Sequence, residues 1–101
     1  MSARGMELEK LRKKIEEVTK ASREKYVAAS GARIVHKEMP QGALIELTRA
    51  VLRMCWDVGD LLDNLMPLPK RVDPETVSEI ERFVDSLESL VKAIGVADKS
   101  T

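Results

Sequence analysis

Apolar residues recur at alternating spacings of three and four along most of the chain, which is the period of a helix that packs on another helix. In the first such run, charged residues fill most of the positions between the apolar ones, which are Leu8, Leu11, Ile15 and Val18. Small residues then continue the stripe and would allow a neighbouring backbone to approach closely, until Gly31 interrupts it. We expect a first helix over about 6–38, with a break near residue 31 as an open alternative.

A second helix is expected over 43–66, between two proline-containing turns. Pro40 and Gly42 form the first turn, and Pro67 and Pro69 end the helix because proline cannot continue it. Its seam keeps a heptad spacing through Leu44, Leu47, Val51, Met54, Val58, Leu61 and Leu65. A second apolar stripe lies beside this seam, which predicts that the second helix is the central one and touches two neighbours.

A third helix is expected over 74–95. Asp73 suits the N-cap, Pro74 the first helical position, and Glu75 the positive end of the helix dipole. Its seam consists of Val77, Ile80, Val84, Leu87, Val91 and Ile94, flanked by Phe83 and Leu90. The last residues, 97–101, are expected to fray.

The predicted fold is all-α, in a single domain over 1–101. We expect a three-helix antiparallel bundle, or a helical hairpin plus a third helix, with coiled-coil-like seams. At 1.5 Å per residue an unbroken first helix would be about 50 Å long and would extend beyond the other two. Its regular seams and its overhang favour association, either as a homo-oligomer or as a subunit of a larger complex. A self-contained monomeric bundle is the alternative.

Composition narrows the class of protein. The 101 residues include 17 basic and 17 acidic side chains, so the formal net charge is zero, and 34% of residues are charged. No uncharged stretch is long enough for a membrane span or a signal peptide, and the single cysteine excludes an internal disulfide, so a cytoplasmic location without membrane contact is expected. The abundance of charge and the scarcity of side-chain amides resemble thermophile usage.

Charge is divided unevenly along the chain. Residues 1–40 contain ten basic and six acidic side chains, whereas residues 41–101 contain seven and eleven. One interpretation is a helical subunit of a nucleoprotein assembly, in which phosphates are contacted by Lys10, Arg12, Lys13, Lys14, Lys20 and Arg23. The other is that the basic first helix pairs with acidic helices of its own or a sister chain.

Acidic residues on the second helix suggest a metal site. Asp57 and Asp60 lie within one helical turn and could share a divalent cation. The segment 56–62 (WDVGDLL) faintly resembles a helical signature of the all-α nucleoside-triphosphate pyrophosphohydrolases, a resemblance that implies a divalent-metal-dependent enzyme. The facing acidic pair implied by that family would be Glu79 with Glu81, or Glu81 with Asp85. The alternative is a solvated acidic face on which Asp57 pairs with Arg53.

Trp56 is the most suggestive single residue. It lies off the apolar seam and on the same face as Arg49 and Arg53. Tryptophan and arginine are enriched at binding hot spots, so Arg49, Arg53 and Trp56 are candidate partner-binding residues. The sequence marks no catalytic constellation and no cofactor motif, so an enzyme is not favoured. We therefore expect a small interaction or assembly module whose partner is itself or another helical protein.

Overall fold

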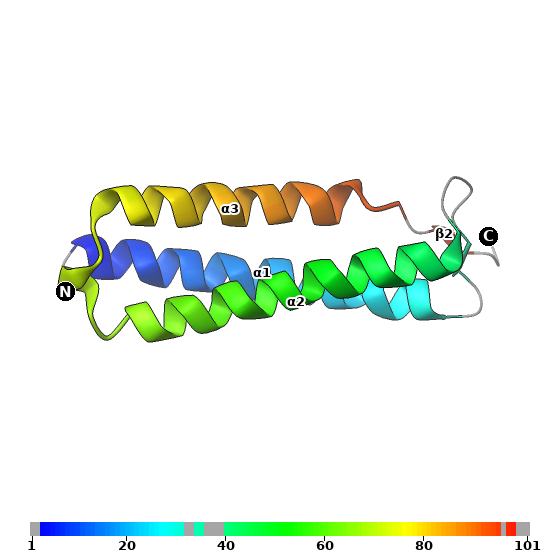
Figure 1. Ribbon diagram of the computed structural model, residues 1–101, viewed down its shortest axis with the longest axis horizontal. Helices are drawn as coiled ribbons and strands as arrows, with labels where there is room; N and C mark the ends of the chain where they lie inside the picture. Colours follow the sequence, from blue (N-terminus) through cyan, green and yellow to red (C-terminus); the bar gives the residue numbers. More distant parts are fainter. Residues whose placement is uncertain (1–2, 32–33, 36–39, 96, 99–101) are drawn as a thin grey trace.

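The computed structural model describes residues 3–31, 34–35, 40–95 and 97–98. Its elements in chain order are α1 (Ala3–Ser30), β1 (Ile34–Val35), α2 (Gln41–Leu65), the 3-10 turn η1 (Pro69–Arg71), α3 (Pro74–Ala93) and β2 (Ala97–Asp98). The three α-helices lie side by side in a rod of 50 × 19 × 17 Å, with α2 running opposite to α1 and α3 (Figure 1). The chain is an all-α three-helix bundle. None of its described helices is both long and apolar enough to cross a membrane.

The first helix is shorter than the apolar pattern suggested. It ends at Ser30 rather than near residue 38, one residue before Gly31, whose N–H donates to the carbonyls of Val27 and Ala28. Glycine has a low helix propensity, and the β-branched pair that follows joins a strand instead. Residues 36–38 lie outside the described residues. At about 42 Å, α1 spans little more than α2, so the expected overhang is absent relative to α2, whereas α1 is eight residues longer than α3.

Two short strands join the segment after α1 to the end of the chain. β1 pairs antiparallel with β2, with Ile34 opposite Asp98 and Val35 opposite Ala97. The prediction of a frayed tail from residue 97 is therefore wrong for Ala97 and Asp98, while residues 99–101 lie outside the described residues. Each strand has two residues, too few to produce an alternating pattern in the sequence.

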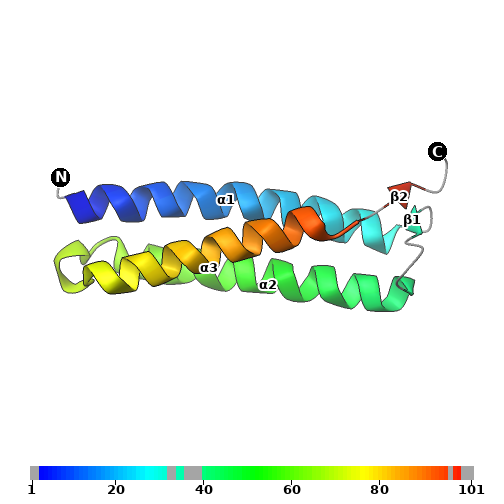
Figure 2. The ribbon, with the colours of Figure 1, turned by 90° about the horizontal axis from the view of Figure 1, so that it is seen from above.

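The central helix is α1, not α2. Figure 2 shows α1 along the upper edge of the bundle, with α3 and α2 below it, and α1 packs closely against each of them, whereas α2 and α3 approach each other at few places. The α1–α2 interface is close because small side chains line it, among them Ser22 and Ala29 of α1 and Cys55 and Gly59 of α2, all of them buried. The broad apolar face of α2 is therefore used mostly against α1.

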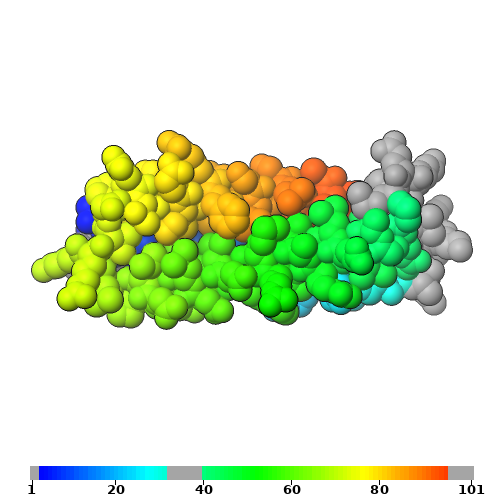
Figure 3. Space-filling model, viewed as in Figure 1, coloured from blue at the N-terminus to red at the C-terminus, as the bar shows by residue number. Residues whose placement is uncertain are grey.

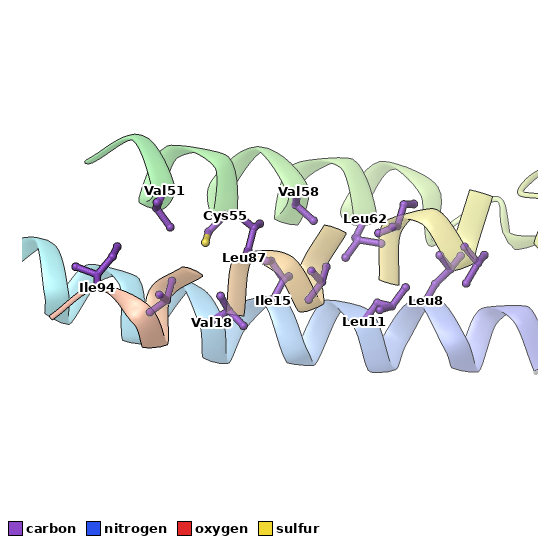
Figure 4. Packing of buried hydrophobic residues seen from close by; sticks show 14 of the residues in the cluster. Leu8, Leu11, Ile15, Val18, Val51, Cys55, Val58, Leu62, Leu87 and Ile94 are labelled. Carbon is purple, nitrogen blue, oxygen red and sulfur yellow. The ribbon is translucent and has the colours of Figure 1, made fainter. Parts of the chain in front are cut away.

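The core is formed by the predicted seams of α1 and α3 and by three of the seven residues of the predicted seam of α2. Every seam residue of α1 and of α3 is buried. Figure 4 shows Val51, Val58 and Leu62 of α2 among the residues packed with Ile15 and Val18 of α1. The other members of the α2 seam are partly buried or exposed, namely Leu47, Met54, Leu61 and Leu65.

Local hydrogen bonds fix the ends of the helices. The side-chain amide of Gln41 donates to the carbonyl oxygens of Ala29 and Gly31, at 3.3 and 3.1 Å, and so joins the end of α1 to the start of α2. Asp73 caps α3 as predicted, because its Oδ1 accepts a hydrogen bond from the Thr76 N–H at 2.7 Å. Such a cap satisfies a backbone donor that the helix itself leaves unpaired.

Replacing Asp73 with Ala is expected to lower the thermal midpoint, whereas Asp73→Asn, which keeps an acceptor, should preserve most of it. The hydrogen bond from Thr76 holds the pKa of Asp73 below its ordinary value. Its stabilising effect is therefore fully present above the ordinary aspartate pKa of about 3.9 and is lost as pH falls through the lowered value. Thermal melts of all three proteins from about pH 2 to pH 7 test this. Equal midpoints for the Ala and Asn variants near neutrality would refute the cap.

Candidate interaction surface

An exposed apolar surface runs along the side of the bundle where α2 and α3 face solvent together. Three of its members are exposed, Leu61 by 44%, Phe83 by 45% and Leu90 by 36%, and two are partly buried, Leu47 and Met54. We call these five residues the α2–α3 stripe. Figure 3 shows this side of the molecule, where α2 and α3 lie next to each other along the rod.

The members of the stripe come from different helices but lie at matching heights. Arg12 and Lys14, two residues apart on α1, form ion pairs with Asp63 of α2 and Asp85 of α3. These pairs fix how far the antiparallel helices α2 and α3 are shifted along the rod. Leu61 is therefore nearly level with Phe83, and one heptad further on Met54 is nearly level with Leu90. The stripe thus has two rungs, meaning pairs of residues at the same height: Leu61 with Phe83, and Met54 with Leu90 one heptad away.

The stripe is exposed because α2 and α3 do not pack closely enough against each other to bury it. α2 directs its small residues toward α1, so its large residues at 47, 54 and 61 lie about a quarter turn away, on the side of α3. The backbones of α2 and α3 approach each other at few places. Apolar residues spaced by seven on two neighbouring helices form the type of surface on which a further helix packs.

The predicted partner-binding residues lie on a different part of α2. Trp56 is 51% exposed, and Arg49 and Arg53 are exposed as well. Trp56 borders an open hollow of about 440 Å³ between α1 and α2, whose other lining residues include Arg12, Lys20, Arg23, Cys55 and Gly59. The indole therefore belongs to the α1–α2 side, and Arg53 lies between it and the stripe.

Several residues of the hollow already form ion pairs or hydrogen bonds with other side chains. Arg12 Nε donates to Asp63 Oδ1 at 2.6 Å and its Nη1 lies 3.2 Å from Glu16, and these carboxylates, Asp63 above all, raise the pKa of Arg12. Cys55 at the floor is fully buried, and burial raises the pKa of its thiol against the opposing effect of hydrogen bonds with Ser22 and Thr19. A buried thiol with a raised pKa is a poor nucleophile.

The basic residues predicted to contact phosphate divide into two groups. Arg12, Lys13 and Lys14 form ion pairs with Asp63, Glu9 and Asp85 respectively. Lys10, Lys20 and Arg23 form no ion pair with any described residue. Two of these ion pairs join basic α1 to the acidic helices α2 and α3 of the same chain. Such pairs are what we expect if the basic first helix pairs with acidic helices of its own chain.

The acidic residues predicted to bind metal are not brought together into a site. Asp57 and Asp60 are exposed, and within the described ranges no three His, Cys, Asp or Glu side chains lie close enough to hold a metal ion. Glu79 pairs with Arg82, and Asp85 with Lys14. Asp57 and Arg53, expected as an ion pair, form none in the part of the chain that the structure describes.

Comparison with known proteins gives no assignment, since no family model, curated protein or solved structure matches this chain. The resemblance of residues 56–62 to the pyrophosphohydrolases therefore stands on those residues alone.

Proposed function

We propose that this protein is a helical interaction module that binds an amphipathic helix along the α2–α3 stripe. The observation that supports the proposal is the exposure of Leu61, Phe83 and Leu90 on adjacent antiparallel helices, at heptad spacing and matching heights. A lone apolar residue on a surface is ordinary, but a continuous apolar surface indicates contact with a partner.

The three helices already share a core, to which a partner helix would add a fourth layer. Among the described residues, fifteen buried apolar side chains of the three helices form one continuous core, which Val72 and Ile94 extend beyond α3 at its two ends. A helix on the stripe would cover the side chains at the junction of α2 and α3 and complete a four-helix arrangement, the commonest way to bury such a surface. Burying half-exposed Leu and Phe side chains contributes about 1 kcal/mol each, enough for association when four or five act together.

A titration with a model helix tests the proposal. The probe is a fluorescent synthetic peptide with leucine at each core position of three heptads, followed by anisotropy. We expect saturable binding to the wild-type protein and binding weaker by about tenfold or more to the double variant Leu61→Lys, Phe83→Lys, because two lysines on the same rung, one from each helix, would have to be desolvated.

A matched control separates the stripe from added charge. The double variant Ser78→Lys, Ser89→Lys places the same two charges at exposed positions of α3 outside the stripe and should bind like wild type. Circular dichroism checks that both variants keep their helix content. A wild-type protein that neither binds the peptide nor associates with itself at any concentration would refute the proposal.

A further inference from the structure

Resting on the proposed function, we propose that the helix bound along the α2–α3 stripe belongs to a second copy of this chain, related by a twofold axis that places the two α2 helices antiparallel. Such an axis requires a surface complementary to itself, so that residue i of one copy meets residue j of the other and j meets i. The exposed edge of α2 beside the stripe, which includes Ala50, Arg53, Asp57 and Leu61 and which we call the border, meets this requirement in the charges and sizes of its side chains.

The border carries an unpaired cation, Arg53, and an unpaired anion, Asp57, together with Glu46 and Asp60, which lie one heptad before and after Arg53. Arg53 and Asp57 are exposed, stand one turn apart, and form no ion pair with each other or with any other described residue. When two α2 helices pack antiparallel around the level of residue 55, Arg53 of each copy lies beside Asp57 of the other. The twofold axis therefore generates two equivalent ion pairs from one pair of residues.

The same register also matches side-chain sizes. Leu61 has a large, exposed side chain, and Ala50, eleven residues earlier and also exposed, has a small one on the same border. With Arg53 beside Asp57 of the second copy, Leu61 lies opposite Ala50 of that copy, so a large residue fits over a small one. The rung formed by Met54 and Leu90 then lies next to the axis, and Leu61 and Phe83 lie toward the ends of the contact.

An unrelated partner would not need this arrangement. A foreign helix requires only apolar contacts along the stripe and places no demand on the relation between Arg53 and Asp57. Opposite charges placed symmetrically about one level of α2, in register with a large and a small residue, favour a second copy over another protein.

Exchange of the two charges tests the proposal. Arg53→Glu alone places two like-charge contacts in the dimer, as does Asp57→Arg alone. We expect each single variant to dimerise about tenfold or more weakly than wild type, since two attractive contacts become repulsive. An equimolar mixture of the two variants should form a heterodimer near wild-type affinity, because both of its pairs are then attractive. Sedimentation equilibrium gives the affinities, and native mass spectrometry identifies the heterodimer.

The outcomes separate this proposal from the function on which it rests. Recovery of dimer in the mixture, and in the double variant Arg53→Glu, Asp57→Arg, supports the second copy, since an ion pair within one helix could not be restored by mixing. A mixture as weak as its components, or a monomeric wild-type protein, overturns the second copy. If the leucine peptide still binds the stripe in that case, the proposed function stands without it, and if neither peptide nor second copy binds, both fail.

Discussion

Replacing Ile15 with Ala is expected to lower the free energy of unfolding by about 2–5 kcal/mol, a large share of the 5–15 kcal/mol typical of a domain. Ile15 is fully buried in the middle of α1, the helix that packs against both others. The truncated side chain would leave a cavity that neither neighbour can close, because both are tied to α1 on either side of the site. Gln41 and Asp63 tie α2 to α1, and Asp85 and the Ile94 carbonyl, which accepts from Lys25, tie α3.

Urea denaturation followed by circular dichroism measures this loss, with Ile15→Val as the matched control. The valine removes one methylene and should cost about 0.5–1.5 kcal/mol. A cost below about 1 kcal/mol for the alanine variant would show that α1 is not the centre of the core.

Replacing Ser22 with Leu is expected to have the second largest effect, a loss of about 1–3 kcal/mol through overpacking. Ser22 is 1% exposed and forms a hydrogen bond with Cys55, at the place where α1 and α2 approach closely. The additional carbon atoms have no space unless the two helices separate.

Ser22→Ala is the control for this prediction. It removes the hydroxyl while keeping the side chain small, so it should be much milder than leucine, and the difference between the two variants isolates the lack of space. Urea denaturation curves of both variants provide the comparison. Equal stability of the Leu and Ala variants would contradict a close α1–α2 interface.

The elements that sequence could predict are those determined by neighbours along the chain. The seams of α1 and α3 are buried as expected because their period alone identifies one face of each helix. The Asp73 cap is likewise local, since acceptor and donor lie three residues apart. The early end of α1 was left open by the sequence, because Gly31 weakens a helix without forbidding it, and the pairing of residues 34–35 with 97–98 depends on a contact distant in sequence.

The candidate surface could be predicted only in part. Heptad spacing predicts that Leu47, Met54 and Leu61 face another helix, but it does not say whether that helix is in the same chain. The small residues of α2 pack against α1, and this orientation of α2 leaves Leu61 outside the core. Trp56 stands out in the sequence because it is a rare residue among charges, whereas the stripe becomes visible only when Phe83 and Leu90 of α3 are placed beside α2. The ion pair of Arg12 with Asp63 spans 51 residues and has no local signal.

Hydroxyl-radical footprinting at increasing protein concentration, with and without the leucine peptide, tests most directly whether the α2–α3 stripe is the contact surface. Phe83 and Met54 should become protected as the contact forms, while Trp56, exposed on the other side of α2, stays equally reactive. Unchanged oxidation of Phe83 and Met54 under every condition would contradict the account. Protection of Trp56 in their place would move the contact to the α1–α2 side of the bundle and would contradict it equally.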